Sequence, residues 1–236
     1  MKRRFLLICC ILFLISCKKN TSDERVQVNI SMENYSGKSA VNRSYNITQA
    51  RLYLSGFELV DNSGMATAVK DLILVNKNNS AEQNSFSFKM PSGNFTRLRY
   101  HFGLDKTTNN TVDPASFDAT HPLSLSQDMY WGMMRYRFIV VEGTIDSSAA
   151  KDQTPANPFS MHLGTDTIYR TITKDLALTS GSTINIRLDL NKLFILDENT
   201  FDITHFSNHS AGSEIPDAIV ITDNFVSGIQ TTVTNP

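Results

Sequence analysis

Cysteine is nearly absent from this sequence, and the few cysteines lie at its beginning. The 236 residues hold three, of which Cys17 is the last. No thiol remains downstream for a disulfide, a thiolate metal site or a cysteine nucleophile. An apolar run long enough to span a bilayer is also missing. The run at residues 5–15 has only eleven residues, which is too few.

An excess of basic charge is missing as well. The chain has 22 Lys and Arg against 23 Asp and Glu. Nucleic-acid binding rests mainly on neutralising phosphates with basic side chains, so this balance argues against nucleic acid as a partner.

The first residues have the pattern of an export signal. Lys2, Arg3 and Arg4 precede the apolar run, and Ser16 follows it. The stretch Leu14-Ile15-Ser16-Cys17 resembles the lipobox of bacterial lipoproteins, in which the cysteine becomes the lipid-bearing first residue. The resemblance implies a signal peptide at 1–16, a lipidated Cys17 with its tether at 17–25, and one domain at 26–236. It also implies an outer-membrane lipoprotein that faces the periplasm or the cell surface, with the lipid as its contact to the membrane.

Removal of that signal changes the charge of the chain. A mature protein that begins at Cys17 has 220 residues, with 19 basic and 23 acidic side chains and a net charge of −4. The case against nucleic acid becomes stronger, and the length is ample for a real hydrophobic core.

Apolar residues alternate with polar ones along most of the chain. In residues 183–190 four apolar side chains alternate with four polar ones, as in a strand with one face in a core. Gly56 interrupts one candidate strand and shifts its apolar phase, which indicates a bulge. The sequence predicts an all-β fold, an antiparallel β-sandwich with long loops at 106–127 and 146–157 and a short C-terminal helix at 216–229. The predicted strands are 26–32, 47–60, 69–75, 85–90, 95–104, 130–145, 166–178 and 183–190.

Residues 128–136 have the most unusual composition. They hold Trp131, the only tryptophan, together with Met129, Met133 and Met134. Methionines and aromatics often fill irregular space where a strand enters a core, which is one interpretation. The other is a Cu(I) site, because thioether and imidazole ligands suit that ion.

A copper site without cysteine needs histidines. His121 lies in the loop ten residues before Trp131. His162 alternates with Phe159, Met161 and Leu163, so it lies on the other face of its predicted strand. The remaining histidines are His101, His205 and His209.

Several of these segments together resemble the MbnP-like family, which are periplasmic or lipid-anchored β-sandwich proteins related to the methanobactin-associated copper-binding protein. The segments that carry the resemblance are Phe102-Gly103-Leu104-Asp105, Met129-Tyr130-Trp131-Gly132-Met133, Glu142-Gly143 and Phe159-Ser160-Met161-His162-Leu163-Gly164.

The resemblance implies a chemistry for two residues. In studied members, histidines hold Cu(I) beside a tryptophan oxidised to kynurenine, and a di-haem partner of the MauG and cytochrome c peroxidase type is credited with the oxidation. The match places Trp131 at that tryptophan and His162 at the family's histidine. The sequence departs from the family pattern at Met133, where a second tryptophan is common.

Two hypotheses of different class follow. The first is a non-enzymatic, lipid-anchored copper-binding protein, with His162 and either His121 or His205 as ligands and Met133 or Met129 as a soft auxiliary. The second is a cell-surface β-sandwich module without metal, which binds a partner or a glycan through Trp131. Histidines that converge on the Trp131 ring favour copper, whereas a buried Trp131 with scattered histidines favours the module. An enzyme has the least support, because no nucleophile and base occur at a recognisable spacing.

Overall fold

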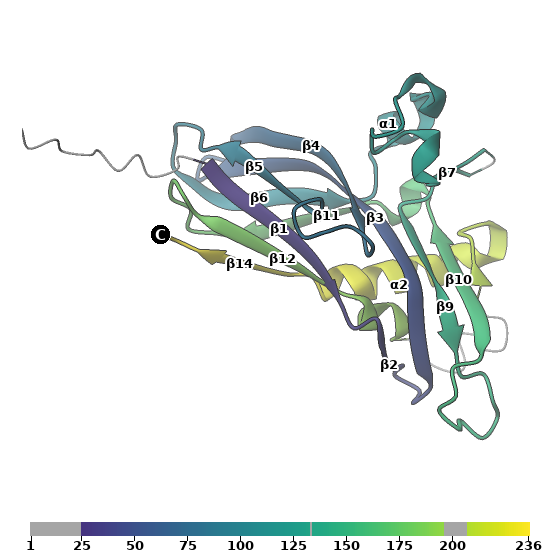
Figure 1. Cartoon of the computed structure of the whole chain (residues 1–236). Coiled ribbons are helices and arrows are strands. Elements are labelled where there is room, and N and C mark those ends of the chain that lie inside the picture. The colour runs from purple at the N-terminus through teal and green to yellow at the C-terminus, as the bar shows by residue number, and fades with distance from the viewer. Residues whose placement is uncertain (1–24, 133, 196–206) are drawn as a thin grey trace, which may run out of the picture.

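The computed structural model describes residues 25–132, 134–195 and 207–236. The predicted signal peptide, Cys17, Met133 and His205 lie outside these ranges. Within them the protein is mainly β, with sheets packed in a sandwich-like arrangement and a short C-terminal helix, as the sequence predicts (Figure 1). No helix in the described ranges is long and apolar enough to cross a membrane.

The smaller sheet has four strands in the order β14-β12-β1-β5. Its β1 and β12 run parallel, which is an exception to the predicted antiparallel pairing. A chain can pair parallel strands only through a long connection, which alternation along single strands does not reveal. The strands are β1 (Arg25–Glu33), β5 (Ser85–Lys89), β12 (Thr183–Asp189) and β14 (Gln230–Thr234).

The larger sheet has the order β11-β6-β3-β9-β10-β13, with β2 and β4 also paired to the long strand β3. Gly56 has φ +57° and lies within the register shift of β3 against β6, between Ser55 and Glu58. The register against β4 shifts just beyond it, between Phe57 and Glu58, so the predicted bulge is confirmed. The strands are β2 (Ser36–Lys38), β3 (Ser44–Asp61), β4 (Ala66–Asn76), β6 (Phe95–Phe102), β9 (Ile139–Ile145), β10 (Asn157–Leu163), β11 (Arg170–Asp175) and β13 (Ser207–Asn208).

Two predicted strands are shorter than expected. The segment 130–145 is broken into β7 (Tyr130–Trp131), β8 (Arg135–Tyr136) and β9, because Arg135 has φ +64° and turns the chain. The segment 166–178 begins with a 3-10 turn, Asp166–Ile168, in which the Thr167 backbone N–H donates to the Thr165 hydroxyl, and only Arg170–Asp175 is extended. In both places local turn chemistry overrides the apolar alternation.

Aromatic side chains join the layers. Phe57 of β3 lies 4.9 Å, ring centre to ring centre, from Phe86 of the other sheet and stacks on Tyr100 at 5.2 Å. The helix α2 (Ile215–Ser227) begins one residue before Pro216, which lies in its first turn close to the predicted start, and it packs Phe225 against Phe102 of β6. The core therefore continues from the sheets to the terminal helix.

A short helix follows β6 in the chain. The helix α1 (Lys106–Thr111) is capped by the Asp105 carboxylate, which accepts hydrogen bonds from the backbone N–H groups of Thr107 and Thr108.

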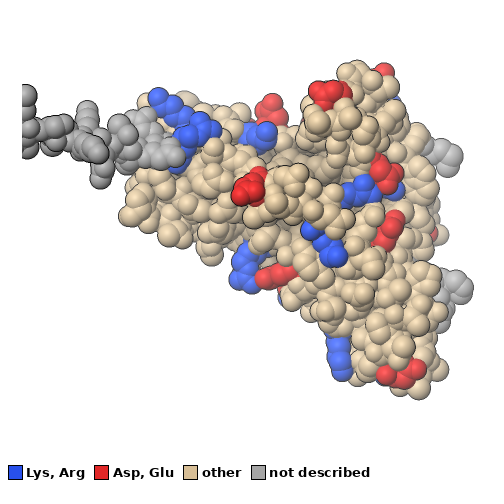
Figure 2. Space-filling view, viewed as in Figure 1, with Lys and Arg blue, Asp and Glu red and all other residues tan. Residues whose placement is uncertain are grey.

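On the face shown in Figure 2, basic and acidic side chains are dispersed among uncharged ones and form no large area of one sign.

Candidate functional site

The strand pair β9 and β10 positions His162. Phe159, Met161 and Leu163 are buried, while His162 lies on the opposite face of β10, as its alternation predicts. Neighbouring strands place Glu142 of β9 on that same face. Glu142 Oε1 lies 2.7 Å from His162 Nε2.

This contact decides which nitrogen of His162 carries the proton. An ionised carboxylate can only accept a hydrogen bond, so His162 Nε2–H donates to Glu142. The neutral ring then has a free lone pair on Nδ1. That atom is buried and has no hydrogen-bond partner within the described residues. A buried acceptor without a partner is costly, and such groups are uncommon in folded proteins.

The surroundings keep the His162 ring neutral. Burial lowers its pKa below the ordinary value of 6.5, and the positive charge of Arg137 acts in the same direction. The hydrogen bond to Glu142 opposes this shift only in part. At neutral pH the ring is therefore an uncharged imidazole, the form that binds metals.

Trp131 lies at the tip of a small hairpin made by β7 and β8, where it pairs with Arg135. Its side chain is 44 % exposed, a large fraction for a tryptophan. The guanidinium of Arg137 lies 5.7 Å from the centre of the indole ring, within the range of a cation–π contact. Trp131 is therefore a surface residue held from one side, and it does not fill the core.

Asp128 fixes the base of this hairpin. Its carboxylate binds Arg137 at 3.0 Å and Arg51 at 2.9 Å, and its own backbone is left-handed, with φ 51°. Burial alone would raise the pKa of Asp128, but the hydrogen bond from Arg51 and the two positive charges lower it on balance. The ionised carboxylate thus holds the guanidinium of Arg137 beside the indole.

Two histidines converge on the Trp131 ring. The ring centre of His162 lies 5.8 Å from that of Trp131, and the ring centre of His209 lies 5.3 Å from it. The two imidazole centres are 5.3 Å apart. We call Trp131, His162 and His209 the Trp–His cluster.

His209 is not among the ligands predicted from the sequence. It follows the two-residue strand β13, which pairs in parallel with β10 so that Asn208 lies opposite Met161. The residues that follow these two in the sequence are His209 and His162. Glu214 fastens this segment by accepting a hydrogen bond from the His209 backbone N–H at 2.7 Å. The only signal in the sequence was the spacing of His205 and His209, and it does not show which strand the segment joins.

Met129 and His121, the two other predicted ligands within the described residues, lie outside the cluster. Met129 is fully buried in the hydrophobic core. His121 stacks on Phe117, with ring centres 3.9 Å apart, and its Nδ1 accepts a hydrogen bond from the Leu123 backbone N–H. Neither residue makes a ring contact to the Trp–His cluster among the described residues.

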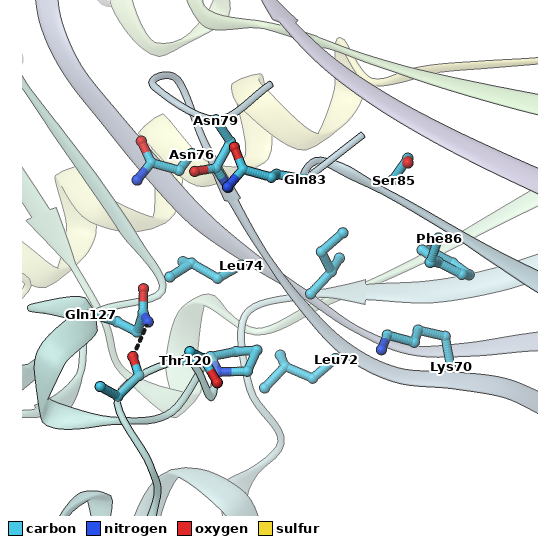
Figure 3. A pocket seen from close by; sticks show the side chains of 13 residues that line it. Lys70, Leu72, Leu74, Asn76, Asn79, Gln83, Ser85, Phe86, Thr120 and Gln127 are labelled. Atoms are coloured by element: carbon cyan, nitrogen blue, oxygen red, sulfur yellow. Dashed lines mark hydrogen bonds between the residues drawn. The ribbon is translucent and has the colours of Figure 1, made fainter. Parts of the chain in front are cut away.

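A hollow of about 450 Å³ lies beside β4, apart from the Trp–His cluster (Figure 3). Lys70, Leu72 and Leu74 of β4 line one side and Gln127 lies opposite. Lys70 is the only charged side chain in this lining. The lining of this hollow contains no histidine, so it offers fewer candidate metal ligands than the Trp–His cluster.

The fold and the cluster define a mainly β, sandwich-like protein with a surface tryptophan packed against two histidines. A model of the MbnP family matches residues 15–214, so the chain belongs to that family, as the sequence motifs predict. It is similar in structure to MbnP from Methylosinus trichosporium, with a TM-score of 0.58 and 17 % identity over 82 % of this chain and 86 % of that one. No curated protein matches the sequence.

Proposed function

We propose that this protein is a non-enzymatic copper-binding protein of the cell envelope, with His162 and His209 as ligands and Trp131 beside the ion. Membership of the MbnP family supports a copper-related role. The observation that carries the proposal is the buried Nδ1 of His162, which has no hydrogen-bond partner among the described residues. Burial keeps this ring neutral, and Glu142 orients it. A carboxylate bound to the far nitrogen of a histidine is the usual support of a metal ligand.

The residues of the cluster fit copper. Bonds between a metal and an imidazole nitrogen are about 2 Å long, so two rings with centres 5.3 Å apart are close enough to share one ion. Imidazole suits copper, and a site without thiolates tolerates an oxidising compartment. Within the described ranges no three side chains of His, Cys, Asp or Glu converge as a metal site, so the proposal rests on two imidazoles and the indole.

The cluster favours copper over the alternative of a metal-free glycan module. An exposed Trp131 would serve a glycan platform equally well. A glycan, however, does not need two imidazoles packed against the indole, nor the buried Nδ1 of His162 without a partner among the described residues. The exposed indole also leaves Trp131 accessible to an oxidising partner, for which we propose the di-haem enzyme that the family resemblance implies.

Competition with a chromogenic Cu(I) chelator tests the ligands. The full chain in mild detergent is titrated anaerobically, and mass spectrometry of the same samples shows whether Trp131 is oxidised. We expect His162→Ala and His209→Ala each to weaken Cu(I) binding by more than about 100-fold, because the loss of a ligand exceeds the roughly 10- to 100-fold cost of losing a supporting residue.

The matched control is His121→Ala. Its ring is stacked on Phe117, apart from the cluster, so this variant should bind Cu(I) like the wild type. Wild-type affinity in a variant that combines His162→Ala with Trp131→Phe would rule out this site. A loss of affinity in His121→Ala alone would instead assign the copper to the other predicted ligand.

A further inference from the structure

A second cavity, of about 470 Å³, lies between the large sheet and the loop that follows α1. Its volume is within the range of small-molecule sites in proteins. The Trp–His cluster contributes no residue to its lining, and the proposed copper function does not use it. We call it the Gly56 cavity, after the glycine in its wall.

Two stacked pairs of rings line this cavity. His101 of β6 stacks on Tyr169 with ring centres 4.9 Å apart and an angle of 18° between the planes. His121 stacks on Phe117 at 3.9 Å and 5°. His101 lies on β6 and Tyr169 directly before β11, whereas Phe117 and His121 lie in the loop. Aromatic rings therefore line the cavity from both the sheet and the loop.

The backbone at Gly56 makes room for one of these rings. A Cβ at this position would meet the His101 ring carbon Cδ2 at 2.8 Å, so a side chain here would push the imidazole away. The residue also has φ +57°, a conformation that glycine adopts at little cost. The bulge in β3 therefore sets the position of the His101 and Tyr169 pair.

Charge in the cavity is of one sign. Asp71 and Asp105 contribute carboxylates, and neither Lys nor Arg belongs to the lining. Burial lowers the pKa of His101 below 6.5, so this imidazole is neutral at pH 7. The cavity is therefore complementary to a positively charged ligand, since the faces of its aromatic rings also attract cations.

A bare metal ion fits these residues less well than an organic cation. No three His, Cys, Asp or Glu side chains converge for a metal within the described residues. The His121 Nδ1 is occupied by the Leu123 N–H, and the Asp105 carboxylate accepts hydrogen bonds from Thr107 and Thr108. Leu72, Leu104 and Val112 add apolar surface, which favours a ring.

We propose that the Gly56 cavity binds a small planar aromatic cation, whose ring packs between the two stacked pairs and whose positive group lies near Asp71 and Asp105. The two aromatic walls supply the specificity for a flat ring. The two carboxylates select the sign of its charge.

Tryptamine and indole-3-acetate form a matched pair of probes, because they share the indole ring and carry opposite charges. The full chain in mild detergent is kept free of copper by a chelator, and both probes are titrated while the histidine ring signals are followed by NMR. We expect tryptamine to shift the signals of His101 and His121 in a saturable manner. Indole-3-acetate should bind at least about fivefold more weakly, which corresponds to about 1 kcal/mol for the charge contacts.

Two variants test the walls and the charge separately. Phe117→Ala should weaken tryptamine binding by about fivefold or more, because it removes an aromatic wall. Asp71→Asn should weaken it by about two- to fivefold, and this exposed residue can change without loss of the fold. The control Asp152→Asn, in the loop between β9 and β10, should leave the affinity unchanged.

Equal binding of the two probes would overturn the assignment of a cation site. Failure of tryptamine to shift either histidine signal would overturn the cavity itself, and so would unchanged affinity in both Phe117→Ala and Asp71→Asn. Because copper is absent from these titrations, none of these outcomes bears on the proposed copper site.

Discussion

At the scale of single residues, the candidate site depends on the hydrogen bond between the Glu142 carboxylate and the His162 imidazole. Glu142 orients His162 and fixes its proton on Nε2, while burial and Arg137 hold the ring neutral. The sequence predicted the face on which His162 lies, because alternation on a strand decides it. It did not predict Glu142 as the partner, because the register of β9 against β10 comes from pairing across the sheet.

The variant Glu142→Gln tests this pairing. Glu142 raises the pKa of His162 against the opposing effect of burial, so its neutralisation should lower that pKa further. We also expect Cu(I) affinity to fall by about tenfold or more, as for other residues that support a metal ligand. NMR titration of the His162 ring measures the first effect and chelator competition the second.

Glu33→Gln is the matched control. Glu33 pairs with Arg187 at the surface of the smaller sheet, so its replacement should leave the titration of His162 unchanged. An unaltered or raised pKa of His162 in Glu142→Gln would contradict the role assigned to Glu142.

At the scale of elements, glycines in the motif segments allow strands to approach one another. A Cβ on Gly143 would collide with the backbone carbonyl oxygen of Asn46 on β3, and one on Gly164 with that of Tyr136. The sequence placed both glycines beside Glu142 and His162 in the segments that resemble the MbnP-like family. Only the tertiary structure shows that Gly143 lets β9 lie close to the backbone of β3, and that Gly164 lets the chain after β10 lie close to the backbone of Tyr136.

The substitution Gly143→Ala should therefore destabilise the fold. The clash is with backbone, which cannot rotate away as a side chain can, so we expect a loss of about 3 kcal/mol in the free energy of unfolding. Denaturant unfolding followed by circular dichroism measures this loss.

Gly132→Ala serves as the control, because no heavy atom lies within 4 Å of a Cβ at that position. It should change the free energy of unfolding by no more than about 0.5 kcal/mol. Equal stability of the two variants would show that β3 and β9 are not packed as closely as the structure has them.

At the scale of the whole molecule, the first described strand is β1, and the anchor that we propose lies before it in the sequence. Strand β1 starts at Arg25, so the short polar stretch 18–24 connects it to Cys17. We propose that a lipid on Cys17 attaches the domain to the outer membrane, on its periplasmic or its external face.

Replacement of Cys17 by serine tests the anchor. The wild-type protein, expressed in a bacterium with lipoprotein processing, should enter the detergent phase on phase separation and take up labelled palmitate. The variant Cys17→Ser should remain in the aqueous phase, because it has no thiol to carry a lipid. Cys10→Ser, within the predicted signal peptide, should behave as the wild type, and entry of Cys17→Ser into the detergent phase would refute lipidation there.

The sequence by itself determined the fold class, the Gly56 bulge, the terminal helix and the family, because alternation, turn residues and motifs are local properties of the chain. It also indicated Trp131 and His162 as residues of interest. Only the tertiary structure decided that His209 joins them, while Met129 is buried in the core and His121 stacks on Phe117. The physical reason is that parallel pairing of β10 with β13, and of β1 with β12, brings together residues far apart in sequence. No local pattern records such a pairing.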